Sequence, residues 1–156
     1  GNNIEEKHLD VDASNDAWHN RGMTAQHYQD SYFNITTETW PADPSFFVTE
    51  KIFKPIINLQ PFAVCGLPGN LKYLKEKGYE TFPEWFVEDY DSIEGHPQRM
   101  FYLTREIIRN AKLSHEELHK KYVDTWEKLV HNRNRFFEFD HTQGFKDLIK
   151  GIQELT

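Results

Sequence analysis

The most constraining feature of this sequence is a continuous apolar run, PFAVCG, from Pro61 to Gly66. An unbroken run of this length is typical of a strand buried in a parallel sheet. A second segment, DSYFNITTETW from Asp30 to Trp40, is rich in aromatic and β-branched residues and also predicts a strand. The residues between them, from Thr49 to about Asn58, have the pattern of a helix. The three segments together predict a strand-helix-strand unit.

The rest of the chain adds mainly helices to this unit. LPGNLKYLKEKGY predicts a short helix that stops at Gly78, and ETFPEWF, residues 80–86, predicts another short strand. Pro97 is placed to begin a helix, and Ser114 begins a long one with apolar residues at helical spacing as far as Val130. GFKDLIKGIQELT predicts a final amphipathic helix. We therefore predict a Rossmann-like, three-layer α/β/α fold, with a mostly parallel sheet and a helical C-terminal tail.

Length and composition limit the classes of function. The 156 residues suit one domain, and we expect a polar N-terminal segment over residues 1–22 followed by a single domain over residues 23–156. The net charge of −7 argues against partners such as nucleic acid or an anionic membrane, and the sequence has no apolar run of membrane length. Cys65 is the only cysteine, so a disulfide within the chain is impossible. We expect a buried thiol and a reducing, cytoplasmic location.

The start of the first predicted helix has an unusual charge pattern. Thr49 can cap the helix and Glu50 suits the positive end of its dipole, but Lys51 opposes that dipole. Lys51 therefore indicates an anion at the helix start, where backbone N–H groups already suit one. Glu38, near the end of the preceding strand, belongs to the same carboxyl edge of the sheet, where ligands bind in open α/β folds. These four residues predict a nucleotide or nucleotide-sugar pocket; an ordinary capped helix start is the alternative.

The same residues resemble the donor-binding signature of the α-1,3-fucosyltransferases. In that family an aromatic strand ending in Glu-Asn is followed by an aromatic residue, Val or Ile, and Thr-Glu-Lys. Here YFNITTET, residues 32–39, is similar to the first half, and FVTEK, residues 47–51, to the second. PFAV then resembles the family's next strand. The chain also resembles phage and environmental proteins that carry TEK, KPI and LKYL stretches.

The resemblance implies the C-terminal, donor-binding half of a two-domain, GT-B-type glycosyltransferase. In that family the lysine contacts the donor phosphates and the glutamate contacts the ribose, and these roles carry over to Lys51 and Glu50. Such enzymes use a nucleotide-diphosphate sugar as donor without an active-site metal, so no cofactor is expected. The acceptor-binding domain, which supplies the general base, has no room before the first predicted strand. We expect a module that binds a donor but is incomplete as an enzyme without a missing N-terminal acceptor domain.

Two alternatives come from other classes of protein. A noncatalytic interaction module can have the same fold, because fold alone does not determine function. A zinc-dependent hydrolase is indicated by HEELH, residues 115–119, in which two histidines one helical turn apart can reach one metal ion. Glu138 has the spacing of a third ligand. The cap at Ser114 and the charged residues around the motif favour a solvated helix face instead, and we predict no catalytic zinc there.

Four smaller groups have both a chemical and a structural interpretation. DVD, residues 10–12, and the acidic residues of EDYD, residues 88–91, could hold a metal, but polar loops and turns explain them more simply. The aromatic residues of WFVEDY, residues 85–90, could stack on a base, but core packing is the commoner role. HNRNR, residues 131–135, could reach a phosphate pocket, but cations near a helix end also favour its dipole.

Overall fold

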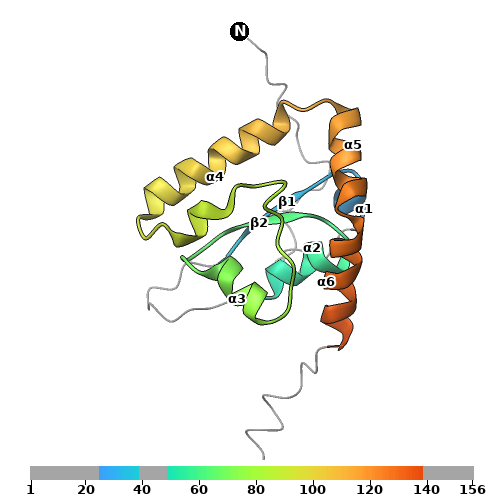
Figure 1. Cartoon of the computed structure of the whole chain (residues 1–156), viewed down its shortest axis with the longest axis horizontal. Coiled ribbons are helices and arrows are strands. Elements are labelled where there is room, and N and C mark those ends of the chain that lie inside the picture. Colours follow the sequence, from blue (N-terminus) through green and yellow to red (C-terminus); the bar gives the residue numbers. More distant parts are fainter. Residues whose placement is uncertain (1–24, 39–48, 139–156) are drawn as a thin grey trace, which may run out of the picture.

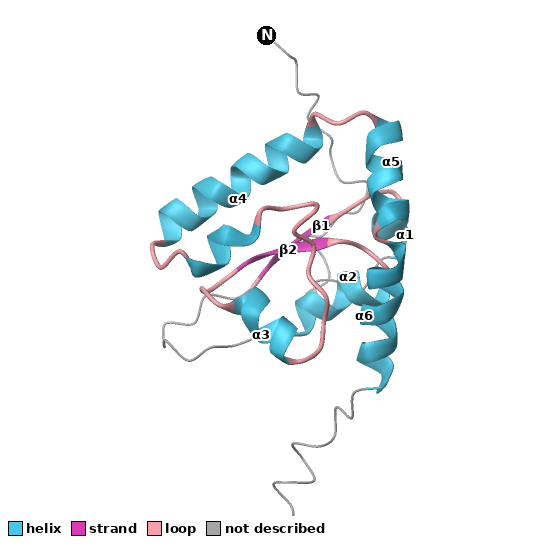
Figure 2. Cartoon of the chain, viewed as in Figure 1, coloured by secondary structure: helices cyan, strands magenta, loops and turns pink. Residues whose placement is uncertain are grey.

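The computed structural model describes residues 25–38 and 49–138 (Figure 1). Two short parallel strands, β1 (Asn34–Thr37) and β2 (Phe62–Cys65), lie at the centre with helices around them (Figure 2). Helices make up 61% of the described residues and strands 8%. The prediction of a Rossmann-like, three-layer α/β/α fold with a mostly parallel sheet is therefore wrong. The described part is a helical domain built around one two-stranded parallel sheet.

The predicted strand-helix-strand unit forms the centre of the domain. Asn34 pairs with Phe62, and the register continues to the end of both strands. The chain enters the crossover through the 3-10 turn η2 (Glu50–Ile52), which leads into α2 (Phe53–Ile57). Thr49 is the N-cap of η2, and its side-chain oxygen accepts a hydrogen bond from the Lys51 backbone N–H at 3.3 Å. The unit agrees with the sequence prediction, although both strands are shorter.

The remaining helices surround this unit. They are α1 (Ala25–Gln29), α3 (Asn70–Glu76), η3 (Glu88–Ser92), α4 (His96–Ala111), α5 (His115–Asp124) and α6 (Trp126–Glu138). α4 lies across one side of the strands, and α5 and α6 follow each other along another side (Figure 1). Ser114 caps α5 in a full capping box with Glu117, as the sequence predicts for a helix start. No described helix combines the length and the apolar character that crossing a membrane requires.

The segment ETFPEWF does not form the predicted third strand. Its backbone groups are used elsewhere: the Glu80 N–H donates to Asn132 Oδ1 at 2.7 Å, and Asn132 Nδ2 donates to the Glu80 carbonyl at 2.8 Å. The N–H groups of Trp85 and Phe86 both donate to the Phe82 carbonyl at 2.9 Å, which closes a turn. An amide side chain from α6 thus takes the place of a neighbouring strand, and the sheet has two strands within the described part of the chain.

The long helix predicted from Ser114 to Val130 is two helices, α5 and α6. The interruption is at Thr125, whose side chain is buried and makes hydrogen bonds within the core. Its hydroxyl accepts a hydrogen bond from Trp85 Nε1 at 3.1 Å and donates to the Lys121 carbonyl at 2.6 Å. The interruption therefore coincides with a contact to Trp85, a fully buried side chain. The predicted final helix, GFKDLIKGIQELT, lies outside the described residues, as does DVD.

The core is rich in aromatic side chains. Trp85, Phe86 and Tyr90 are 0%, 1% and 1% exposed, so they fill the core and present no surface for stacking on a base. The Tyr90 hydroxyl accepts a hydrogen bond from the Val64 backbone N–H at 3.1 Å. Burial raises the pKa of Tyr90 far above its ordinary value, so the hydroxyl stays neutral beside the strand. The structural interpretation of these aromatic residues is confirmed.

Candidate functional site

The carboxyl edge of the two strands brings together residues that the sequence assigned to a donor site. Glu38 follows β1, and its backbone N–H donates to the Cys65 carbonyl at 2.9 Å, which extends the pairing of the strands. Its buried carboxylate accepts hydrogen bonds from the Thr49 N–H, 3.2 Å from each oxygen, and from the Thr49 hydroxyl. The sequence predicted that Thr49 begins a helix beside Glu38; Thr49 does lie beside Glu38, and the helix begins there as the 3-10 turn η2 and continues as α2.

Lys51 lies on the same side of the sheet. Its ammonium group donates to Thr49 Oγ1 at 3.3 Å, so Glu38, Thr49 and Lys51 form a connected chain of polar groups. Lys51 is half-buried, whereas Glu50, the first residue of η2, is exposed to solvent. The geometry thus joins three of the four predicted residues and leaves Glu50 at the rim. A role of these residues in binding a donor stays a prediction.

Asn70 is a candidate that the sequence analysis missed. It is the first residue of α3 and is 2% exposed, yet neither Nδ2 nor Oδ1 has a hydrogen-bond partner among the described residues. A Cβ placed on Gly66 would lie 2.2 Å from Asn70 Nδ2 and 3.2 Å from Glu38 Cβ. Gly66 therefore allows the buried amide to approach Glu38 closely. A buried amide without a partner is rare and often marks a position that a ligand or water completes.

The end of β2 adds a thiol and a buried cation. Arg99, in the first turn of α4, is 1% exposed, and its guanidinium donates to the Ile93 carbonyl at 2.7 Å. Burial raises the pKa of the Cys65 thiol, an effect that the charge of Arg99 only partly opposes. The thiol is therefore neutral near pH 7, and its sulfur lies 3.1 Å from Met100 Sδ. It is half-buried, and so less enclosed than predicted.

Replacing Gly66 with alanine is expected to lower the free energy of unfolding by about 1 to 3 kcal/mol, because the new methyl group has no space between Asn70 and Glu38. Gly95→Ala is the matched control. Its methyl group would meet only the end of the exposed Gln98 side chain, which can move away. Urea unfolding of both variants measures the difference. Equal stability of the two variants would contradict the close approach at Gly66.

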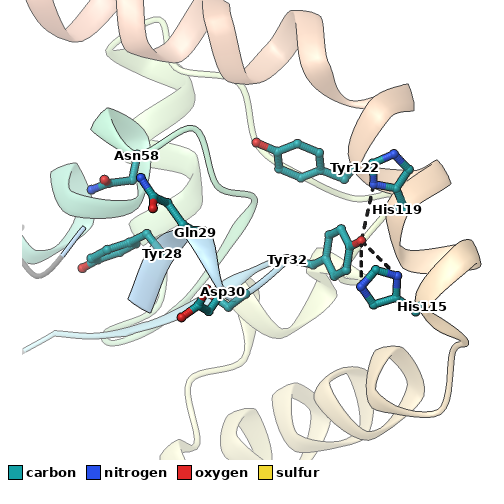
Figure 3. Close-up of a pocket in the computed structure, with 9 residues that line it drawn as sticks. Tyr28, Gln29, Asp30, Tyr32, Asn58, His115, His119 and Tyr122 are labelled. Atoms are coloured by element: carbon teal, nitrogen blue, oxygen red, sulfur yellow. Dashed lines mark hydrogen bonds between the residues drawn. The ribbon is translucent and has the colours of Figure 1, made fainter. Parts of the chain in front are cut away.

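A pocket of about 510 Å³ lies beside the segment that leads into β1, away from the carboxyl edge (Figure 3). The residues that line it are Tyr28, Gln29, Asp30, Ser31, Tyr32, Asn58, His115, His119 and Tyr122. Burial raises the pKa of both Tyr28 and Tyr122, which keeps their hydroxyls neutral. The Tyr122 hydroxyl donates to the Leu59 carbonyl at 3.0 Å. The pocket is therefore polar but uncharged on its tyrosine side.

The HEELH motif contributes both of its histidines to this pocket. His115 and His119 are exposed on α5, and the Tyr32 hydroxyl points between their rings (Figure 3). Glu138, the third ligand suggested by spacing, is an exposed residue at the end of α6. Within residues 25–38 and 49–138, no group of three His, Cys, Asp or Glu side chains is arranged to hold a metal ion. The absence of catalytic zinc stays a prediction.

Two other charged groups stabilise helix ends. Asp91 accepts hydrogen bonds from the backbone N–H groups of Leu71 and Lys72, each at 3.1 Å, in the first turn of α3. At the other end of that helix, residues of HNRNR reach carbonyl groups: His131 Nε2 lies 2.9 Å from the Gly78 oxygen, and Arg135 binds the Lys77 oxygen at 2.9 Å. The Asp91 carboxylate and the Arg135 guanidinium complement the dipole of α3, which supports the structural interpretation of both groups.

Comparisons with protein-family models, curated proteins and solved structures gave no match. No relative therefore supports or opposes the resemblance to fucosyltransferases.

Proposed function

We propose that this chain carries a module that binds a nucleotide-diphosphate sugar at the carboxyl edge of β1 and β2, as in the α-1,3-fucosyltransferase-like glycosyltransferases that the TEK segment resembles. The observation that carries the proposal is the connected group of Glu38, Thr49 and Lys51 at that edge. The proposal needs only one parallel strand-helix-strand unit, because such a unit already places a helix start beside the carboxyl ends of both strands.

Each residue has a role that its position supports. The Lys51 ammonium stabilises the negative charge of the diphosphate, both on binding and as the diphosphate leaves. Glu38 holds Thr49 in place through the N–H and hydroxyl of that residue, which orients the turn that carries Lys51. Glu50 is exposed at the rim, where it can reach ribose hydroxyls. The Asn70 amide offers a donor and an acceptor to the nucleotide or sugar.

The proposal also covers cofactor, partners and location. Donor binding through an ammonium group and backbone N–H groups needs no metal ion, and we propose no cofactor. In this proposal a separate acceptor-binding domain supplies the acceptor site and the general base, and the residues at the carboxyl edge bind the donor. A cytoplasmic location agrees with the single, half-buried cysteine.

Lys51→Ala is expected to weaken binding of guanosine or uridine diphosphate by on the order of 1.5 to 3 kcal/mol, the usual contribution of a charge-assisted hydrogen bond. Isothermal titration calorimetry measures the change. Lys54→Ala is the matched control, because Lys54 lies in α2, beyond the η2 turn that Thr49 caps. It should have a much smaller effect, and the free energy of unfolding should change little in either variant.

The proposal is wrong if the unmodified protein binds neither nucleotide at millimolar concentration.

A noncatalytic interaction module would then be the better explanation, and α4 provides the observation that favours it. Phe101 and Ile108, two turns apart on that helix, are 61% and 48% exposed. Apolar side chains of this size are exposed at a cost in solvation, which is commonly recovered when they pack against a partner.

A further inference from the structure

The outer face of α4 exposes apolar side chains. Phe101, Tyr102 and Ile108 are exposed, and the rings of Phe101 and Tyr102 meet edge to face with centroids 6.0 Å apart. The exposed Val87 lies beside the helix, because its backbone N–H donates to Glu106 Oε2 at 3.0 Å. α4 lies at the edge of the molecule (Figure 1), and residues of its opposite face are buried. We call the exposed side chains of residue 87 and of residues 96–112 the α4 patch.

The centre of the α4 patch is a row of alternating apolar and basic side chains. Phe101, Arg105, Ile108 and Lys112 follow one another at intervals of four, three and four residues, a spacing that aligns side chains along one side of a helix. All four are exposed. The Arg105 guanidinium lies 6.0 Å from the centroid of the Phe101 ring, within reach of a cation–π contact. The row therefore offers apolar surface and positive charge together.

The exposed charge of α4 is positive although the chain is acidic. The chain has a net charge of −7, but residues 96–112 contain four Arg or Lys residues and a single acidic residue, Glu106. Glu106 is largely buried and forms an ion pair with Arg109 at 2.6 Å, so it does not offset the other charges of the row. Neither Arg105 nor Lys112 forms an ion pair with a carboxylate of the described residues. A partner that carries acidic groups beside apolar ones complements this surface.

We propose that the α4 patch binds an acidic amphipathic helix of a partner protein. A helix fits because the row runs along a regular helix of 16 residues, and helices pack along such rows. Apolar side chains of the partner cover Phe101 and Ile108, and its carboxylates meet Arg105 and Lys112. The α4 patch is on the side of α4 that faces away from the core, so this binding is additional to that at the carboxyl edge and independent of it.

Two other occupants fit the α4 patch less well. A second copy that docks through the same face would bring two rows of positive charge together, and like charges across an interface weaken it. An anionic membrane would face the rest of the acidic chain as well as the patch, which adds repulsion. A single helix contacts only the patch, and charges more than about 8 Å away are largely screened at physiological salt.

Two synthetic peptides of about 18 residues, or five helical turns, test the proposal. Both have leucines along one face. The first has glutamates on either side of the leucines, and the second has lysines at the same positions. Fluorescence anisotropy of the labelled peptides measures binding to the unmodified chain. We expect a dissociation constant below about 0.1 mM for the glutamate peptide and an affinity at least about tenfold lower for the lysine peptide.

Single substitutions locate the binding surface. Phe101→Ala and Arg105→Glu should each weaken binding of the glutamate peptide by at least about tenfold. Phe137→Ala and Arg133→Glu are the matched controls, because they make the same changes at exposed positions of α6, and both should keep an affinity close to that of the unmodified chain. All four side chains are exposed, so stability should change little, and circular dichroism checks that each variant is folded.

Several results would overturn the proposal. The first is that the unmodified chain binds neither peptide at about 1 mM, and the second is that it binds both equally well. The third is an equal loss of affinity in the α6 variants. Self-association that Phe101→Ala abolishes in analytical ultracentrifugation would assign the patch to a second copy instead. Binding to phosphatidylserine vesicles that Arg105→Glu abolishes would assign it to an anionic membrane.

Discussion

Replacing Trp85 with alanine is expected to lower the free energy of unfolding by about 3 to 5 kcal/mol, the usual cost of removing a large aromatic side chain from a core. Trp85 is 0% exposed, and its Nε1 donates to the Thr125 hydroxyl at 3.1 Å. The Lys121 ammonium lies 4.6 Å from the ring centroid. The substitution removes these contacts and leaves a cavity between the α5–α6 junction and the turn that carries Trp85.

Trp126→Ala is the control for this prediction. Trp126 begins α6 and is 43% exposed, with its ring 6.0 Å from that of Tyr122. Because 43% of its surface is exposed, its removal is expected to cost clearly less than removal of the fully buried Trp85. Urea unfolding followed by far-ultraviolet circular dichroism compares the variants without depending on tryptophan fluorescence. A smaller loss for Trp85→Ala than for Trp126→Ala would contradict the core described above.

Glu38→Ala is expected to lower the free energy of unfolding by about 2 to 4 kcal/mol, because it leaves the buried N–H of Thr49 without an acceptor. The same change removes the acceptor for the Thr49 hydroxyl, which orients the η2 turn. A second consequence concerns binding: nucleotide affinity should fall together with stability, because the turn also carries Lys51. Thermal or urea unfolding and calorimetric titration measure the two effects separately.

Two further variants define the role of Glu38. Glu38→Gln keeps one oxygen that can accept from the Thr49 N–H, so we expect it to lose about half as much stability as the alanine variant. Glu50→Ala removes an exposed carboxylate from the residue next to Lys51 and should change stability by no more than about 0.5 kcal/mol. If Glu38→Ala proves as stable as the unmodified chain, the carboxylate does not hold the turn, and the connected group at the carboxyl edge loses its structural basis.

Local signals allowed much of the secondary structure to be predicted. Thr49 and Ser114 have hydroxyls that cap helical turns, and both do so in the structure. Pro97 lies in the first turn of α4, and Gly78 follows α3 with a φ of +83°, a conformation that glycine adopts without strain. The apolar run PFAVCG contains the buried strand β2. Each of these features depends on residues that are adjacent in the sequence, so the sequence alone is enough to predict them.

The candidate sites were only partly predictable. Glu38 and Thr49 were assigned to one edge because a parallel strand-helix-strand unit brings a strand end and the following helix start together, whatever surrounds it. Asn70 gave no such signal, because its importance comes from burial without a partner, a property that depends on the packing of α3 against Gly66. The contact of Tyr32 with His115 and His119 was also missed, since it depends on where α5 packs.

The sequence alone determined the helix starts, the central strand-helix-strand unit and the aromatic composition of the core, because caps, apolar runs and prolines act over a few residues. The tertiary structure decided how many strands pair and where the long helix breaks. ETFPEWF has the composition of a strand, but the Asn132 side chain takes the backbone hydrogen bonds of Glu80 that a neighbouring strand would have needed. The helix ends at Thr125 because the hydroxyl of that residue accepts a hydrogen bond from the buried Trp85. Both outcomes depend on which distant segments compete for the same polar groups, and local sequence does not encode that competition.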